Sequence, residues 1–262
     1  MEKLNSKNNE KIKYARALAR SSAERKASGE FLLEGARLCS DAAESGTEIV
    51  RAFFTETAIS KYGEYIGAVE SVCSECYEIS EEASDKISDT GSSQGVFCVC
   101  RAPDRSALSL KPGGRYIALE NVQDPSNVGA VIRSAEALGI DALIISGGCD
   151  IYNPKALRAA MGSSLRMDIF TPDDLPEFIR RARENGMKAF ACVPDRSAFD
   201  IRKINEISGG KGIICCIGNE GSGLTEQTVN ACDAAVTIVM QGRAESLNAA
   251  AAAALTAWEL KR

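Results

Sequence analysis

The chain has 262 residues and a formal net charge of −5, and 45% of its residues are hydrophobic. This length fits one large domain or two modest ones with a sizeable core. The sequence contains no histidine, which excludes histidine-based triads, general bases and metal ligands.

The composition also limits the cellular setting that we expect. No apolar run approaches the ~18 residues of a membrane helix, and the charged N-terminus is unlike a secretory signal. We therefore expect a cytoplasmic protein with no membrane partner. The ten cysteines are scattered, and several lie in apolar runs, which predicts reduced core thiols. Cys73 and Cys76 have CxxC spacing but no partners that would complete a zinc site, so no metal is expected.

The first 26 residues differ in charge from the rest of the chain. They hold eight lysines and arginines against three glutamates, which is eight minus three or +5, so the remaining residues carry −10. A basic arm on an acidic body can steer a polyanion. A solvated helix face is the alternative interpretation.

The first hundred residues alternate apolar strand-like runs with helical patterns, which predicts a smaller α/β domain over residues 1–104. Residues 21–29 are predicted as a polar, flexible connection, and residues 105–114, within a stretch rich in proline and glycine, as a linker. Strands are expected at 31–35, 49–54, 76–79 and 96–101, and helices at 11–20, 36–44, 56–69 and 81–87.

A second α/β series follows over residues 115–262. Apolar strands that alternate with helices predict a mostly parallel sheet with both faces covered. Strands are expected at 116–120, 142–146, 165–170, 188–193, 212–217 and 234–240, and helices at 127–138, 154–160, 175–184, 224–231 and 246–260.

Ligands of parallel α/β folds gather at loops beyond the carboxyl ends of the strands. The first such loop, residues 121–129, runs into a helix that carries Asn127 and Arg133. These two residues are six positions apart, and we expect them on roughly one face of the helix. A surface arginine with a buried stem is the alternative for Arg133.

The second loop, residues 218–224, follows an apolar strand and holds three glycines around Asn219 and Glu220. Such a turn exposes backbone N–H groups. It is not a P-loop, because it lacks the Lys-Ser/Thr ending.

The third loop leads from Ile238 to a helix that begins with six alanines. Ser246 and Asn248 stand at the mouth of this helix, and both are good N-caps. Polar groups at the positive end of a helix suit a polar ligand, although an ordinary capped helix is the simpler interpretation. Between these loops, Lys155, Arg158 and Arg166 suit phosphate contacts or are solvated cations.

Three motifs thus stand in order: Asp124-Pro125-x-Asn127-x-Gly129-x3-Arg133, Gly218-Asn219-Glu220-Gly221-x-Gly223-Leu224 and Ile238-x-Met240-x-Gly242-x3-Ser246-Leu247-Asn248. Their order, spacing and strand–loop context resemble those of the SpoU (TrmH-type) RNA 2′-O-ribose methyltransferases of the SPOUT class. Residues 26–35 and 88–96 also resemble the ribosomal-protein-like substrate-binding domain of that family. One departure is Val239, where the family usually has proline.

The resemblance implies a parallel-sheet SPOUT domain with a deep trefoil knot, preceded by a smaller substrate-binding domain. It implies S-adenosyl-L-methionine as cofactor, a homodimer and an RNA partner, with ribosomal RNA favoured over transfer RNA. The cofactor-binding residues by motif match are Gly218, Asn219, Gly223, Ile238, Met240 and Leu247.

The resemblance also implies a catalytic group made of Arg133, Asn127, Glu220, Ser246 and Asn248. Arg133 would act on the 2′-hydroxyl either as the base or as a positioning cation, and its permanently charged guanidinium fits the second role better. A transfer-RNA methyltransferase and a non-catalytic RNA-binding or ribosome-assembly protein on the same scaffold are the alternatives. A nucleotide-dependent small-molecule enzyme is a weaker one, because the P-loop lysine and the dinucleotide fingerprint are missing.

Overall fold

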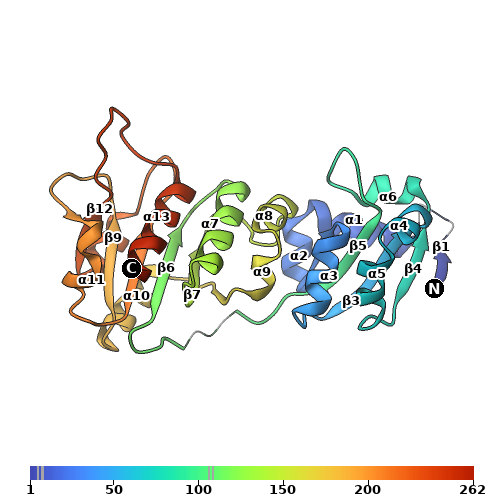
Figure 1. The fold of residues 1–262 in the computed structure, drawn as a ribbon, viewed down its shortest axis with the longest axis horizontal. Helices are drawn as coiled ribbons and strands as arrows, with labels where there is room; N and C mark the ends of the chain where they lie inside the picture. The colour runs from blue at the N-terminus through green and yellow to red at the C-terminus, as the bar shows by residue number, and fades with distance from the viewer. Residues whose placement is uncertain (5, 7–8, 106, 108) are drawn as a thin grey trace. The chain divides into compact units, whose positions relative to one another are not determined.

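A computed structural model describes residues 1–4, 6, 9–105, 107 and 109–262 (Figure 1). Lys7 of the basic arm, and Ser106 and Leu108 of the predicted linker, lie outside the described residues. The chain divides into two compact units, Met1–Pro103 with Asp150–Leu165, and Asp104–Cys149 with Arg166–Arg262. No helix in the described part of the chain has the length and apolar character of a membrane span.

The first unit is built on a five-stranded mixed sheet with the order β1-β4-β3-β5-β2. β4 runs parallel to its neighbours β1 and β3, whereas β5 runs antiparallel to β3 and β2. Its strands are β1 (Glu2–Leu4), β2 (Glu30–Glu34), β3 (Ile49–Thr55), β4 (Cys76–Ile79) and β5 (Val96–Arg101). Its helices are α1 (Glu10–Arg20), α2 (Ser22–Ser28), α3 (Ala36–Glu44), α4 (Glu56–Lys61), α5 (Gly63–Glu70), α6 (Glu81–Ile87) and α8 (Pro154–Ala160), with α9 (Ser163–Arg166) at the unit's boundary.

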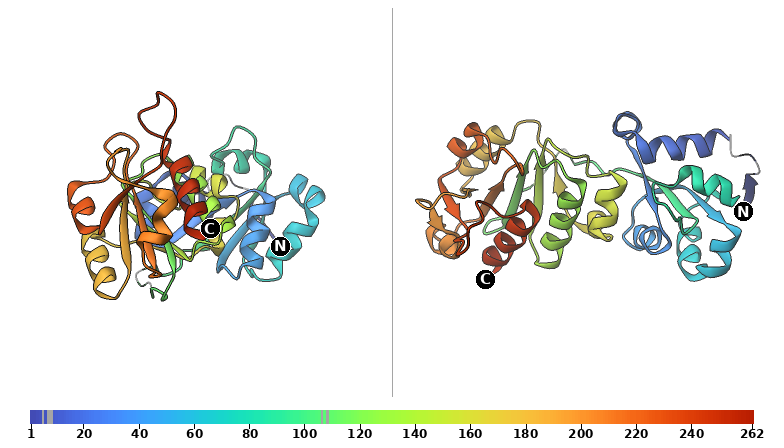
Figure 2. Two further views of the ribbon diagram at one scale, coloured as in Figure 1. Left: turned by 60° about the vertical axis from the view of Figure 1, so that its left-hand side comes forward. Right: turned by 90° about the horizontal axis from the view of Figure 1, so that it is seen from above.

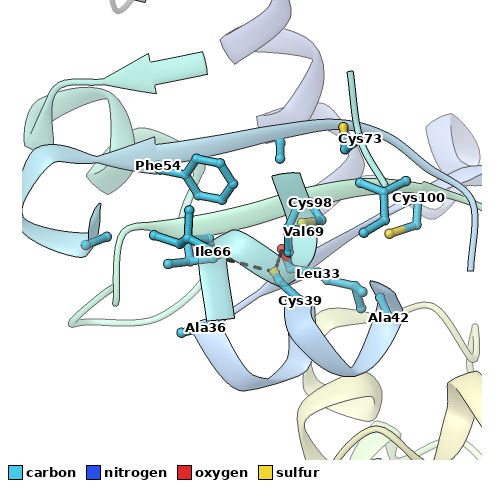
Figure 3. Packing of buried hydrophobic residues seen from close by; sticks show 14 of the residues in the cluster. Leu33, Ala36, Cys39, Ala42, Phe54, Ile66, Val69, Cys73, Cys98 and Cys100 are labelled. Carbon is cyan, nitrogen blue, oxygen red and sulfur yellow. Dashed lines mark hydrogen bonds between the residues drawn. The ribbon is translucent and has the colours of Figure 1, made fainter. Parts of the chain in front are cut away.

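Two apolar clusters cover the two faces of this sheet, as the alternation of strand side chains requires. Phe53 packs with the residues of α1 and α6, whereas the adjacent Phe54 packs with those of α3 and α5. Figure 3 shows Cys39, Cys98 and the other labelled side chains of the second cluster in close contact. Most of the ten free cysteines are buried, which confirms the expectation of core thiols.

Within residues 21–29, where we predicted a flexible connection, Ser22–Ser28 form the helix α2. Ser21 caps α2 by accepting a hydrogen bond from the Glu24 N–H, and Gly29 ends it with a positive φ of 67°. Arg25 is buried within it, and its guanidinium pairs with Asp150 over 2.7 Å. The polar composition of this segment suggested an exposed, flexible connection because the partner of Arg25, Asp150, is remote in the sequence.

The segment Asp150–Leu165 packs with the first unit, although it lies within the sequence of the second. Asp150 pairs with Arg25, the ring of Tyr152 stacks on Phe31 at 4.4 Å, and Leu157 belongs to the apolar cluster of α3 and α5. The division into functional domains at residues 104 and 115 stays a prediction.

The second unit is built on a seven-stranded sheet, and all its described strand pairs are parallel. This confirms the α/β fold predicted for residues 115–262. The strand order is β10-β12-β9-β11-β6-β7-β8. Its strands are β6 (Arg115–Glu120), β7 (Ala142–Ser146), β8 (Ile169–Phe170), β9 (Lys188–Cys192), β10 (Phe199–Asp200), β11 (Ile213–Ile217) and β12 (Ala234–Thr237). Its helices are α7 (Pro125–Ala137), α10 (Leu175–Glu184), the 3₁₀ helix η1 (Ile201–Lys203), α11 (Ile204–Ile207), α12 (Glu226–Ala231) and α13 (Ala249–Lys261).

Helices pair on the faces of this sheet. α10 and α12 pack together over the cluster that contains Tyr116 and Ala118 of β6. α7 and α13 pack against each other, and α13 also contacts β6 and β11 (Figure 2). The alanines of α13 permit this close approach, since Ala249, Ala253 and Ala257 are all buried. The last helix of the chain therefore lies beside the first helix of the unit.

Candidate active site

Three loops meet at the carboxyl edge of the second sheet because their strands lie close together in it. β11 is inserted between β6 and β9, with Ile217 in register with Leu119, and β12 follows on the far side of β9. The loops after β6, β11 and β12 therefore emerge at the same edge, as parallel strands require. These are the three loops that carry the sequence motifs.

Asn219 shapes the loop after β11. Its backbone exchanges two hydrogen bonds of 3.0 Å with Gly223, which closes the turn. Its side-chain oxygen accepts from the N–H groups of Gly221 and Ser222, and its amide donates to the carbonyl of Asn121 over 2.8 Å. Asn219 thus fixes the turn and ties it to the loop after β6.

Gly218 is required by the close approach of the two ends of this turn. A Cβ at position 218 would lie 2.1 Å from the carbonyl carbon of Gly223 and 2.2 Å from the nitrogen of Leu224. Gly223 itself has a φ of +68°, which favours glycine.

Glu220 joins this turn to the other two loops. Its carboxylate accepts from the side-chain amide of Asn127 at 2.8 Å and from the N–H groups of Gln123 and Asp124 at 3.2 and 3.4 Å. The carbonyl oxygen of the Asn127 side chain then accepts from the amide of Asn248 at 3.0 Å. We call Glu220, Asn127 and Asn248 the bridging triplet, since it links the three motifs.

The hydrogen bonds to Glu220 favour its charged form. Partial burial alone would raise the pKa of this carboxyl group. The hydrogen bond from Asn127 and those from backbone N–H groups outweigh burial, so the pKa of Glu220 lies below its ordinary value. The triplet is therefore built around a carboxylate at neutral pH.

Asn248 alone caps α13. Its Oδ1 accepts from the N–H groups of Ala250 and Ala251, and the helix begins at Ala249, three residues later than predicted. Ser246 is an exposed loop residue and is not the cap. Because one amide group both caps α13 and reaches Asn127, the position of the helix and that of the triplet are coupled.

A pocket of about 420 Å³ opens beside the bridging triplet. Its walls come from the loops after β9, β11 and β12 and from the first turn of α13. Of the predicted site residues, those that line it are Gly218, Asn219, Glu220, Gly223, Ile238, Met240, Ser246 and Leu247. The structure thus gathers all six predicted cofactor residues around one cavity.

Two features of the site were missed from the sequence. The wall formed by Cys192, Val193 and Pro194 follows strand β9, so the rule that ligand loops follow strand ends could have found it. The buried Glu120 ends β6, and its carboxylate accepts from the N–H of Thr225 at 2.7 Å and from its hydroxyl at 2.8 Å. Glu120 thereby anchors the far end of the glycine-rich loop.

Arg133 stands apart from the bridging triplet. It is exposed on α7, and within the described part of the chain no hydrogen bond or ion pair involves its guanidinium. The expectation that it shares a face with Asn127 was wrong. At 3.6 residues per turn, six positions rotate the side chain by about 600°, which leaves the two about 120° apart. Arg133 is therefore available to a ligand outside the pocket.

The site contains no arrangement suited to a metal. No group of three or more cysteine, aspartate or glutamate side chains among the described residues could hold an ion. The polar side chains that meet in the bridging triplet are two amides and the Glu220 carboxylate, which is already bonded to N–H donors. Such a set suits the positioning of an organic ligand.

Comparison with known families agrees with this geometry. The SpoU rRNA Methylase family model matches residues 114–258, and the MRM3-like substrate binding domain model matches residues 9–98. The chain belongs to the SpoU rRNA methylase family, and the resemblance inferred from the three motifs is confirmed.

Individual relatives extend over nearly the whole chain. The 23S rRNA (guanosine(2553)-2′-O)-methyltransferase RlmP of Bacillus subtilis is 28% identical over 262 residues, which cover 100% of both chains. The 23S rRNA (uridine(2479)-2′-O)-methyltransferase of Streptomyces viridochromogenes is 26% identical, and the alignment covers 97% of this chain and 90% of the relative.

Solved structures show the same fold. The AdoMet-bound rRNA methyltransferase of Sinorhizobium meliloti has a TM-score of 0.86 at 27% identity, with 99% of this chain and 97% of that chain covered. The SpoU methyltransferase AviRb of Streptomyces viridochromogenes, in complex with AdoMet, also has a TM-score of 0.86, at 25% identity and with 97% of each chain covered.

Proposed function

We propose that this protein transfers the methyl group of S-adenosylmethionine to a ribose 2′-hydroxyl of ribosomal RNA. The family and its named relatives confirm the prediction of an S-adenosylmethionine-dependent RNA 2′-O-methyltransferase. The observation that carries the proposal on this chain is the bridging triplet, which links the three motifs beside one pocket.

The pocket has features that fit the proposed cofactor. One of its walls is a loop whose backbone turns tightly, and the clash that a Cβ would make at Gly218 shows how little space this loop leaves for a side chain. Ile238, Met240 and Leu247 supply apolar surface for an adenine ring and a methionine chain. When bound, the cofactor supplies a methyl group on a positively charged sulfur.

The residues around the pocket divide into two roles in this proposal. Asn127 and Glu220 are bonded to each other and fix the loops, so they are positioning residues. Arg133 and Ser246 have exposed polar groups that can meet RNA. We assign Arg133 to hold an RNA phosphate and to orient the 2′-hydroxyl towards the methyl group, because a guanidinium is a donor that keeps its charge.

The first unit supplies RNA recognition in this proposal. The match of residues 9–98 to a substrate-binding domain supports it, as does the basic N-terminal arm. Not all of that arm is available to RNA, since Arg25 is buried against Asp150 and Lys3 pairs with Glu78. We place the protein in the cytoplasm, because its bacterial relatives are named for 23S rRNA.

A homodimer and a trefoil knot complete the proposal. Leu255 and Trp258, 45% and 58% exposed, lie three residues apart on α13, and such apolar surface is typical of a subunit interface. β11 lies between β6 and β9 in the sheet, and α13 packs beside α7. A trefoil knot with a threaded C-terminus would be built on this arrangement. Sedimentation of the full chain tests the dimer.

Two measurements test the proposed activity. Calorimetry should show S-adenosylmethionine binding to the full chain, and its failure would favour a non-catalytic RNA-binding protein. Transfer of labelled methyl groups should then occur to a 23S rRNA transcript and not to a tRNA mixture. Labelling of tRNA alone would favour the transfer-RNA alternative.

A further inference from the structure

The first unit contains a small pocket of its own, which the proposed chemistry does not use. It has a volume of about 250 Å³ and lies where β2, the start of α3, the loop before β5 and α8 come together. This volume is below the range of about 300–1,000 Å³ that is typical of pockets for drug-sized ligands. The pocket therefore suits one small group.

Two hydrogen-bond donors line this pocket without a partner among the described residues. The Oε1 of Gln94 accepts from the N–H of Ala36 at 2.8 Å, which fixes the amide and leaves its Nε2 free. The Nη2 of Arg158 donates to Asp89 at 3.1 Å, whereas its Nη1 is buried and has no partner. Because an unpaired buried donor is costly, a ligand that supplies an acceptor there would be favoured.

The other walls of the pocket carry charges of both signs and apolar groups, and Arg37 is the cation among them. The carboxylate of Asp41 has no hydrogen bond or ion pair with another described residue, and Glu34 also lines the pocket. Leu38 and Met161 supply the apolar surface. Met161 is unusual, because it adopts a left-handed conformation with φ 50° and is 54% exposed.

We propose that this pocket binds one unpaired nucleobase of the RNA substrate, an inference that rests on the proposed function. A base offers both donors and acceptors on its edge and apolar faces that stack on side chains and guanidinium groups. Two carboxylates and two arginines line the pocket, so it carries no net positive charge that would favour a phosphate over a base. The pocket would thus contribute sequence recognition, since protein recognition of RNA sequence reads bases that are splayed out of a helix.

Two substitutions probe the pocket without disturbing the fold. Met161→Gly removes the apolar wall and relieves the left-handed backbone. Gln94→Glu keeps the acceptor for Ala36 and removes the free donor. Val72→Ala is the matched control, because Val72 is an exposed apolar residue of the same unit outside the pocket.

The binding experiment compares two probes of equal charge by fluorescence anisotropy on the full chain. One is a labelled single-stranded heptanucleotide of mixed sequence, and the other is the same oligonucleotide with abasic residues. Wild type and Val72→Ala should bind the first probe at least about fivefold more tightly, since stacking of one base is worth this much. Met161→Gly and Gln94→Glu should each reduce that preference by threefold or more.

An unchanged preference in both pocket variants, or no preference in the wild type, would overturn the pocket assignment. Methyl transfer to 23S rRNA by the wild type, measured in parallel, separates this result from the proposed function. If the wild type transfers methyl groups but the pocket variants keep the wild-type preference for the base-containing probe, the pocket assignment is rejected and the proposed function stands. If the variants lose the preference for the base-containing probe but the wild type transfers no methyl groups, the pocket assignment is supported and the proposed methyltransferase activity is rejected.

Discussion

Asn248 donates a hydrogen bond to the side chain of Asn127 across 3.0 Å, although 121 positions separate the two residues in the chain. The same Asn248 side chain accepts from the first N–H groups of α13. The amide therefore connects the start of α13 to the first turn of α7. Through Asn127 the connection continues to Glu220 and to the glycine-rich turn.

Asn248→Asp separates the two roles of this amide. An aspartate still accepts from the N–H groups at the start of α13, so the free energy of unfolding should stay within about 0.5 kcal/mol of the wild-type value. It cannot donate to Asn127, and methyl transfer should fall by about 100-fold through misplacement of the loops. Single-turnover assays and urea unfolding measure the two effects. Wild-type activity in this variant would show that the bond to Asn127 is dispensable.

Gly218→Ala should abolish cofactor binding. Its Cβ would lie 2.1 Å from the carbonyl carbon of Gly223, so the turn that lines the pocket must open. Gly221→Ala is the matched control in the same loop, since its Cβ would meet only the side-chain oxygen of Asn219 at 3.5 Å. Calorimetry with S-adenosylmethionine distinguishes the variants. Equal affinity of both would contradict the role of the tight turn.

Acid should weaken cofactor binding through Glu220. The folded-state pKa of this carboxyl lies below its ordinary value of 4.5, so its stabilising effect is complete above that value. The effect is lost as the pH falls through the folded-state pKa and the carboxylate is protonated. Cofactor affinity measured by calorimetry should decline over this acidic range, and Glu220→Gln should lack that decline. A variant with the wild-type pH profile would assign the titration to another group.

Arg25→Met should destabilise the first unit. The ion pair with Asp150 is nearly buried, with side-chain exposures of 4% and 13%. Removal of the guanidinium takes the opposite charge of this pair away from Asp150, which keeps a hydrogen bond from the Tyr152 N–H at 2.9 Å, and should cost up to about 3–5 kcal/mol. Arg16→Met, at an exposed position of α1, should change the free energy of unfolding by less than about 1 kcal/mol. Urea denaturation compares the two variants, and equal values would remove the structural role of the pair.

The sequence predicted features that depend on local pattern. Alternating apolar strands and helices predicted the parallel sheet, and two of the three polar loops supplied residues that line the pocket. The helix predicted at 127–138 was also found, although α7 begins two residues earlier, at Pro125, with Asp124 as its N-cap.

Features that depend on distant partners could not be predicted in this way. Residues 21–29 were predicted as flexible because nothing nearby in the sequence shows that Arg25 meets Asp150. The packing of Asp150–Leu165 with the first unit is likewise a contact between remote segments. The start of α13 was misplaced because Ser246 and Asn248, two positions apart, are both good caps, and only the position of Asn127 shows why Asn248 is the one used.

The central claim is that Arg133 and the bridging triplet direct methyl transfer to a ribose of ribosomal RNA. Arg133→Ala should retain the fold and the affinity for S-adenosylmethionine, since Arg133 is exposed and does not line the pocket. It should lose about 100- to 1,000-fold in methyl transfer, as expected when one positioned donor is removed.

The most direct measurement is a map of ribose 2′-O-methylation in ribosomal RNA from cells that lack the protein. At least one methylated site should disappear, should return on expression of the wild-type chain, and should stay absent with Arg133→Ala. A map that is the same with and without the protein would contradict the account.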